Sequence, residues 1–282
     1  MLFRSPGDEA ALDAFLARHP ESSMFLRSNA RAAGLVDRGA PLEATYVAAV
    51  AEGAIVAVVA HCWNGMVLVQ APAHVEALTR EAVRRSGRAV SGLSGPWHQV
   101  VDARQALGLG TTPALKDSRE DLYRLDLSDL VVPAALASGE LRCRHPEESE
   151  LDLLAEWRAS FSAEALGATA GPELHDASRE EVLLYHARHC DWVLEAGDKV
   201  VAYAVFNATL PDIVQIGGVW TPPALRNRGF GRAVVAGALL AARDQSALRA
   251  VLFAEPSNAP ARRAYLALGF RIVGDYGLVL FQ

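Results

Sequence analysis

The sequence predicts an α/β protein of two domains in succession, each a mostly antiparallel mixed sheet flanked by helices. Its 282 residues are 51% hydrophobic, which is enough for two domain cores of ordinary size. In the second half, three strand-like segments lie close together and then alternate with helical segments. The first half shows the same order of elements. We therefore expect domains at 1–130 and 141–282, joined by a linker at 131–140.

The elements of the second half follow from their periods and from the breaks between them. Breaks at 197–198 and 210–212 are of hairpin type and separate three strands. The helix at 231–242 is apolar on several faces, as expected for a helix packed against a sheet. The predicted order is a strand at 141–144, helices at 148–161 and 179–189, strands at 192–196, 200–207 and 213–219, a helix at 231–242, a strand at 250–254, a helix at 259–268, and two short strands at 271–273 and 276–281.

The first half repeats this plan in a degraded form. A local echo supports the repeat, because residues 106–109 (ALGL) resemble residues 267–270 (ALGF). An unrelated α/β domain with the same order of elements is the alternative. The predicted order is helices at 9–19 and 25–34, strands at 44–51, 54–61 and 66–70, a helix at 73–85, a strand at 89–93, a helix at 98–107, and a strand at 121–127.

A glycine-punctuated turn lies between the strand at 213–219 and the helix at 231–242. Its glycines let the backbone approach an anion closely, and successive amide N–H groups can converge on that anion. The helix N-terminus adds a partial positive charge. The turn is therefore a candidate phosphate site, although a tight strand-to-helix turn uses the same residue types. Its residues are Arg226, Asn227, Arg228, Gly229, Phe230, Gly231 and Arg232.

A second pattern follows the strand at 250–254. Asn258 stands where a helix begins, Tyr265 lies two turns further on, and Gly269-Phe270 ends the helix.

Together, the two patterns resemble the GNAT (Gcn5-related) N-acetyltransferase family, over residues 141–282. The turn matches the family's Arg/Gln-x-x-Gly-x-Gly/Ala signature at Arg226, Gly229 and Gly231. The second pattern is similar to the strand and helix that follow the signature in the family. The resemblance implies two GNAT-like domains in tandem, of which the second is catalytic.

The resemblance also implies acetyl-CoA as the cofactor, with its pyrophosphate on the amides of the turn. The strand end Val219-Trp220-Thr221 would pair with the pantetheine arm as another strand would, and one of its amides would polarise the thioester carbonyl. Tyr265 is the implied acid that protonates the departing thiolate, with a purely packing role as the alternative. Asn258 would bond the pantetheine, cap its helix, or do both.

The general base is not evident from the sequence. Gln215 occupies the position where many relatives carry a glutamate, and an amide cannot take a proton. Alternatives are a water chain, an acid such as Asp212 or Glu255, or an amine that arrives already neutral.

The first half lacks these functional parts. Aligned on the echo, Trp97 and Arg104 take the places of the Asn and the Tyr, and the strand ending at Gln70 passes almost directly into its helix. We expect this domain not to bind the cofactor.

Composition excludes several other classes. A net charge of −6 without a long basic run argues against a nucleic-acid partner. No apolar run is long enough to cross a bilayer, and the amino terminus lacks the apolar core of a signal peptide. We expect a cytoplasmic protein with no membrane partner, and a monomer slightly before a homodimer.

The cysteines predict no disulfide framework and no metal site. Cys62, Cys143 and Cys190 are odd in number and have no C-x-x-C spacing, so buried free thiols are expected. The adjacent pairs His61-Cys62 and His189-Cys190 are interpreted as structural.

The predicted function is acetyl-CoA-dependent N-acetylation of a primary amine, on a small molecule or a peptide, by direct transfer in a ternary complex. The alternatives are transfer of another acyl group, a thiol-metabolite acceptor as in the tandem mycothiol synthases, and a catalytically silent acyl-CoA sensor. The identity of the acceptor cannot be read from the sequence.

Overall fold

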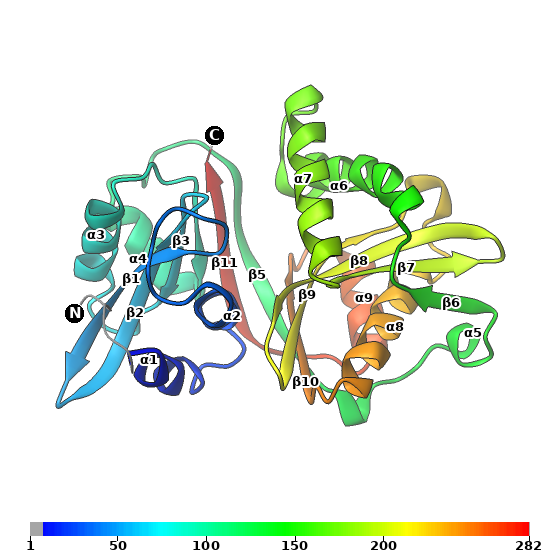
Figure 1. The fold of residues 1–282 in the computed structure, drawn as a ribbon, viewed down its shortest axis with the longest axis horizontal. Coiled ribbons are helices and arrows are strands. Elements are labelled where there is room, and N and C mark those ends of the chain that lie inside the picture. Colours follow the sequence, from blue (N-terminus) through cyan, green and yellow to red (C-terminus); the bar gives the residue numbers. More distant parts are fainter. Residues whose placement is uncertain (1–7, 282) are drawn as a thin grey trace. The chain divides into compact units, whose positions relative to one another are not determined.

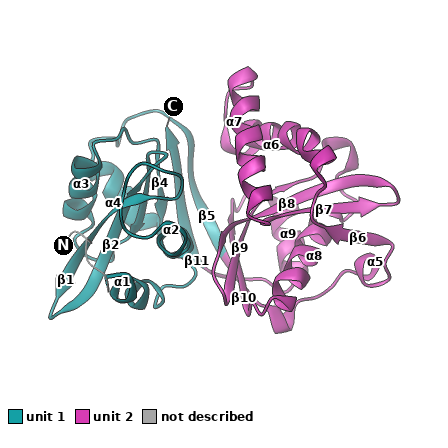
Figure 2. Cartoon of the chain, in the orientation of Figure 1, with its two compact units in different colours: residues 1–122, 274–282 teal, residues 123–273 magenta. Residues whose placement is uncertain are grey.

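A computed structural model describes residues 8–281. The chain divides into two compact units, unit 1 (Met1–Leu122 with Gly274–Gln282) and unit 2 (Tyr123–Val273) (Figure 2). Each unit is a mixed sheet with helices on both faces, so the predicted fold class is confirmed.

In unit 1 the strands follow the order β1-β2-β3-β4-β11. The pairs β1–β2, β2–β3 and β4–β11 are antiparallel, and β3–β4 is parallel. Alternate residues of β1 face opposite layers, since Tyr46 packs with α1 and α2 whereas Val47 packs with α3 and α4. The elements are α1 (Asp8–Leu16), α2 (Met24–Ala33), β1 (Ala44–Ala51), β2 (Ala54–Cys62), β3 (Met66–Gln70), α3 (Val75–Ser86), β4 (Gly92–Gly95), α4 (Trp97–Ala106) and the first part of β5 (Ala114–Asp126).

In unit 2 the strands follow the order β5-β10-β9-β8-β7-β6. Figure 1 shows these strands lying between α6 and α7 on one face and α8 and α9 on the other. The elements are η1 (Leu127–Asp129), α5 (Ala134–Ala137), β6 (Leu141–Arg144), η2 (Glu148–Glu150), α6 (Leu151–Leu166), α7 (Pro172–Ala187), β7 (Asp191–Ala196), β8 (Lys199–Thr209), β9 (Ile213–Trp220), η3 (Pro223–Leu225), α8 (Phe230–Asp244), β10 (Arg249–Ala254), α9 (Ala259–Ala267) and β11 (Arg271–Phe281).

The neighbouring strands β5 and β11 each contribute to both units. The last strand of the chain therefore completes the sheet of unit 1, where residues 277–280 pair with residues 92–95 of β4. Residues 131–140, expected as a linker, contain α5 and lie within unit 2. The expected division into a silent and a catalytic domain concerns function, and it stays a prediction.

Three predicted elements differ most from the structure. β11 is one continuous strand rather than two, because it keeps its extended course through Gly274-Asp275, which read as a turn in the sequence. β5 begins at Ala114 rather than at 121. Its first half is polar, so the sequence there lacks the alternation of apolar and polar residues that predicts a strand. Helix α7 begins at Pro172 rather than 179, with its proline in the first turn, where a missing N–H costs nothing.

The similar segments 106–109 and 267–270 occupy equivalent places in the two units, at the end of a helix. Helices α4 and α9 end at Ala106 and Ala267, and each is followed two residues later by a glycine in the left-handed region, Gly108 (φ 71°) and Gly269 (φ 100°). At Gly269 the glycine is also required sterically, because a Cβ there would lie 2.8 Å from the carbonyl oxygen of Asp129.

Candidate active site

The two parallel strands at the centre of unit 2 separate partway along their length. Strand β9 pairs with β10 over three residues, from Ile213 opposite Arg249 to Gln215 opposite Val251. Both strands then continue, to Trp220 and Ala254, without a further pair between them in the described chain. Beyond Gln215 the facing edges therefore present backbone N–H and C=O groups that need other partners.

Strand β9 also carries a β-bulge just beyond this separation. Gly217 lies opposite Val205 and Trp220 opposite Tyr203, so three steps on β9 match two on β8. The extra residue bends the strand and turns one amide out of the ladder. Gly218 takes φ 55° within the bulge, and the Asn207 side chain fills the space where a Cβ of Gly217 would lie. Glycine pairs inside strands are a known signal for bulges, and the sequence-based interpretation did not use it.

The glycine turn connects the end of β9 to helix α8. Asn227 (φ 65°) and Gly229 (φ 80°) take the left-handed conformation, and the first bond of the helix runs from the Ala233 amide to the Gly229 carbonyl at 2.9 Å. The amides of residues 228–232 donate no hydrogen bond within residues 8–281. No acidic side chain lies in the first turn of α8. The turn is thus a set of open N–H donors at a helix N-terminus, which suits an anion.

The first residue of the signature braces this turn. The Arg226 Nε donates to the Thr221 carbonyl at 3.0 Å, and Nη2 donates to Glu164 Oε2 at 2.9 Å. Its guanidinium lies 4.8 Å from the centre of the Trp220 ring. Arg226 therefore holds the end of β9 against the turn, and a direct contact of its side chain with phosphate stays a prediction, as do those of Arg228 and Arg232.

The second motif lies on helix α9. The Asn258 Oδ1 accepts a hydrogen bond from the Ala261 amide at 3.2 Å, so this side chain caps the helix, and its own amide N–H groups remain for a ligand. The half-buried Tyr265 ring packs edge-on against Tyr123 at 5.8 Å and against Phe270 at 5.9 Å. The ring is therefore held from two sides, whatever its hydroxyl does.

The candidates for the general base differ in position. Gln215 is 2% exposed, and its Nε2 has no partner among the described residues. Asp212 is ion-paired with Arg249 and precedes β9, about 16 Å from the bulge at 3.3 Å per residue. Glu255 follows β10 directly, at the end where the two strands separate, and accepts a hydrogen bond from Ser257 at 3.0 Å. Of the two acids, only Glu255 is placed near the open end.

In unit 1, the positions equivalent to the open strand end and the glycine turn of unit 2 are occupied by the protein's own groups. Only residues 71–74 connect β3 to α3, whereas residues 221–229 connect β9 to α8. The amide of Ala71, directly after β3, is bonded by the buried Gln99 Oε1 at 2.6 Å. A Cβ at Gly95 would collide with the Val69 carbonyl, so β3 and β4 are still close together one residue beyond their last pair, Leu68 with Ser94. Arg104, at the position of Tyr265, donates to the carbonyls of Leu109 and Thr112.

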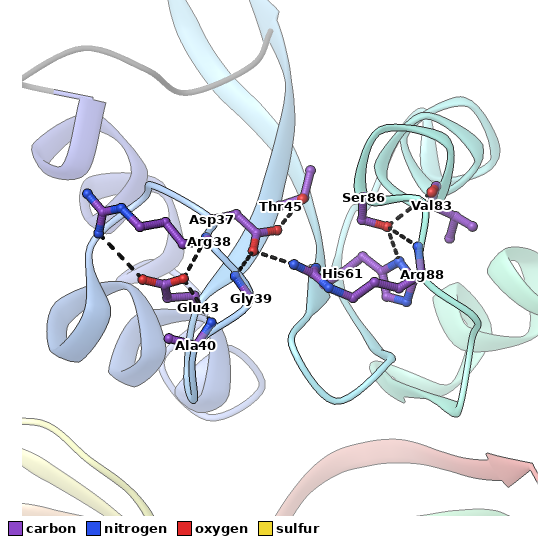
Figure 3. Close-up of polar contacts among 10 residues, drawn as sticks. All are labelled: Asp37, Arg38, Gly39, Ala40, Glu43, Thr45, His61, Val83, Ser86 and Arg88. Atoms are coloured by element: carbon purple, nitrogen blue, oxygen red, sulfur yellow. Dashed lines mark hydrogen bonds and ion pairs between the residues drawn. The ribbon is translucent and has the colours of Figure 1, made fainter.

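A separate polar cluster in unit 1 contains Asp37, Thr45, His61, Ser86 and Arg88, and its groups bond to one another (Figure 3). The His61 ring is fully buried, with Nδ1 2.6 Å from Ser86 Oγ and Nε2 3.1 Å from the Gly65 carbonyl. Figure 3 shows that the aspartate meets Arg88 rather than the imidazole, so the cluster is not a Ser-His-Asp relay.

The thiols of the chain are shielded. Burial raises the pKa of Cys62 and that of Cys143 to about 12. Cys143 also packs directly beneath Gly237 of α8, where a Cβ would collide with it. Since the thiolate is the reactive form, these side chains serve packing.

Asp191, the first residue of β7, is a fully buried carboxylate without a hydrogen-bond partner in the described chain. His186 Nδ1 lies 3.4 Å from one carboxylate oxygen and His145 Nδ1 lies 3.8 Å from the other. Burial raises the pKa of Asp191, and the two imidazoles offset only part of that effect. The ionised side chain therefore destabilises the folded state at neutral pH.

We expect Asp191→Asn to raise the free energy of unfolding at pH 7 by about 1–3 kcal/mol. A raised native pKa means that stability falls as the pH rises from below the unfolded value of about 3.9 through the native value. The gain should therefore shrink as the pH is lowered towards 4. Urea unfolding from pH 4 to 7 measures it, with the exposed Asp152→Asn as the control. A loss of stability at pH 7 would show that the carboxylate is favourably paired.

Comparison with known proteins agrees with this geometry. Residues 151–270 match the model of the acetyltransferase (GNAT) family. A GCN5-related N-acetyltransferase from Kribbella flavida has 18% identity and a TM-score of 0.55, over 92% of this chain and 93% of that one. A tandem GNAT protein from the clavulanic acid biosynthesis pathway has 12% identity and a TM-score of 0.55, over 99% and 96%. A Drosophila protein has 14% identity and a TM-score of 0.68, over 99% and 98%. No curated protein matches the chain.

The class that the comparisons define is therefore that of a protein with an acetyltransferase (GNAT) domain. Residues 151–270 form a GNAT domain, as the resemblance predicted, and the whole chain has the fold of tandem GNAT proteins. Among residues 8–281, no helix is both long and apolar enough to cross a membrane.

Proposed function

We propose that unit 2 binds acetyl-CoA and transfers its acetyl group to a primary amine of a small molecule or peptide, in a ternary complex. The observation that carries the proposal is the continuous run from β9 into α8, where separated strands, a bulge and a turn of open amides follow one another. These features suit the pantetheine arm, the thioester and the pyrophosphate, in that order.

Each part of the cofactor has its partner in this proposal. The amides of residues 228–232 bind the pyrophosphate. The pantetheine arm lies between β9 and β10 and bonds the open backbone of Val219, Trp220 and Thr221, with the amide N–H groups of Asn258 at its side. An amide of the bulge donates to the thioester carbonyl and stabilises the charge that develops on its oxygen.

The transfer then needs two protons to be placed. The amine nitrogen attacks the thioester carbon, the C–S bond breaks, and the thiolate of CoA takes a proton from Tyr265. The amine gives its proton to water, directly or through Glu255. Tyr265 regains a proton from solvent, so the products are the amide and free CoA.

In the same proposal, unit 1 binds no acyl-CoA. Its support is Gln99, which accepts the hydrogen bond of the Ala71 amide after β3, and the four-residue connection 71–74, which carries a proline and no glycine.

Calorimetry and free-CoA release test the proposal together. We expect one acetyl-CoA per chain and CoA release that depends on an added amine, measured over a panel of small amines and peptides. Two equivalents per chain would contradict the assignment of a silent unit 1. Tight binding without release for any acceptor would favour the sensor, and no binding would overturn the proposal.

A further inference from the structure

Arg158, on α6, is a buried arginine with an unfilled hydrogen-bonding end. It is 9% exposed, its Nε donates to Glu181 Oε2 at 2.5 Å, and its guanidinium lies 5.0 Å from the centre of the Phe161 ring. The two terminal nitrogens, Nη1 and Nη2, donate to no residue between 8 and 281. These two nitrogens are not among the fully buried polar atoms, so a ligand can reach them.

The open end of Arg158 lies over the bulge of β9. Its Nη1 is 3.2 Å from the position that a Cβ on Gly218 would occupy. A Cβ there would crowd the guanidinium, which would have to shift by a few tenths of an ångström. In the proposed function this bulge meets the acyl group of the donor, so the free nitrogens of Arg158 lie beside the reacting atoms.

The neighbouring polar groups are also donors without partners. The Tyr203 hydroxyl and the Gln215 Nε2 are buried and have no hydrogen-bond partner in the part of the chain described. Both side chains lie on the face of the sheet that α6 and α7 cover, the face that Arg158 approaches from α6. Tyr203 packs in the α6–α7 core, while Val214 and Ile216, on either side of Gln215, pack on the α8 side.

Neither Glu181 nor Tyr185 bonds the terminal nitrogens of Arg158. Glu181 bonds the Nε edge of the guanidinium, and its side chain is 49% exposed. The Tyr185 hydroxyl is engaged with Asn207 Oδ1 at 3.3 Å. The structure places the guanidinium of Arg158 at the bulge, with Tyr203 and Gln215 on the same face of the sheet, and the natural complement of a guanidinium is a planar oxygen anion.

We propose that Arg158 binds a carboxylate at the reacting end of one of the two substrates. This inference rests on the proposed function and deepens it. An acceptor that carries both an amine and a carboxylate, as an amino acid does, supplies such a group, and so does the acyl chain of a dicarboxylic acyl-CoA. The chemistry at Arg158 is the same for both sources.

Paired substrates distinguish the two sources. In the acceptor arm, amino acids are compared with the amines that lack only the carboxyl group, with acetyl-CoA as donor. In the donor arm, succinyl-CoA and malonyl-CoA are compared with acetyl-CoA, with a neutral amine as acceptor. We expect a preference of about 100-fold in kcat/KM for the carboxylate in one arm. Equal kcat/KM values within both arms would overturn the inference.

The variant Arg158→Gln removes the charge and leaves a shorter polar side chain. We expect it to lower kcat/KM for the preferred carboxylate substrate about 100-fold and that for its neutral partner less than about threefold. Arg158→Lys should recover only part of the loss, because a lysine cannot bond a carboxylate through two parallel N–H groups. The control is Arg179→Gln, an exposed arginine on α7 that pairs with Asp152. Equal losses on charged and neutral substrates would show that Arg158 is structural.

Failure of the two proposals is distinguishable. Calorimetry with acetyl-CoA tests cofactor binding, which Arg158→Gln should leave within about twofold because the residue lies away from the turn at 226–232. If no substrate pair is turned over, titration of the CoA-saturated protein with succinate and with amino acids decides. Binding that is lost in Arg158→Gln supports the inference, and absence of binding overturns it. Thermal unfolding confirms that each variant is folded.

Discussion

Gly231→Glu is expected to abolish acetyl-CoA binding while the protein stays folded. Gly231 lies in the first turn of α8, among the open amides of residues 228–232. A carboxylate there occupies the anion site and repels the pyrophosphate, so we expect Kd to rise at least about 100-fold. The fold accepts the change, since a Cβ at Gly231 meets Thr221 Oγ1 at 3.4 Å and Val219 Cγ1 at 4.0 Å, which are ordinary contacts. An acidic residue at a helix N-terminus also stabilises the helix.

The matched control is Gln245→Glu, at the opposite end of the same helix. It changes the net charge by the same amount at an exposed position and should leave Kd unchanged within about twofold. Calorimetry measures both variants, and thermal unfolding monitors the fold. Wild-type affinity in a folded Gly231→Glu protein would refute the assignment of this turn to the pyrophosphate.

Tyr265→Phe is expected to lower kcat about 100-fold with little change in KM, because only the hydroxyl that protonates the thiolate is lost. Phenylalanine keeps the edge-on contacts of the ring with Tyr123 and Phe270. The loss should be smaller for a donor whose leaving thiol has a lower pKa, since a better leaving group needs less help from an acid. Steady-state kinetics of CoA release measures both effects.

A tyrosine outside the site serves as the control for this substitution. Tyr46→Phe in unit 1 removes a buried hydroxyl that donates to the Leu26 carbonyl at 3.1 Å. It should cost about 1 kcal/mol of stability and leave kcat unchanged. If Tyr265→Phe also keeps the wild-type kcat, Tyr265 is a packing residue and the thiolate takes its proton from water.

The correct sequence-based predictions rest on local signals. The strands of the β7–β9 meander were recognisable because alternate side chains face opposite layers, and the turn before α8 because Asn227 and Gly229 tolerate the left-handed conformation. The cap at Asn258 was one of two readings left open, and the structure shows that it is made. The continuous strand β11 was missed, because its place between β4 and β5 depends on residues far along the chain, and Gly274-Asp275 stay extended against their local preference for a turn.

By itself, the sequence determined the repeated α/β plan, the glycine turn, the helix carrying Tyr265, and the lack of these motifs in the first half. Only the tertiary structure decided that β9 and β10 separate after Gln215, that Gln99 fills the equivalent place in unit 1, and that Arg158 reaches the bulge at Gly218. The physical reason is how far apart the interacting residues lie along the sequence. Turns and caps depend on residues a few positions apart. The pairing of β9 with β10 depends on residues 36 positions apart (215 and 251), and the meeting of α6 with β9 on residues 60 positions apart (158 and 218), whose proximity no local pattern encodes.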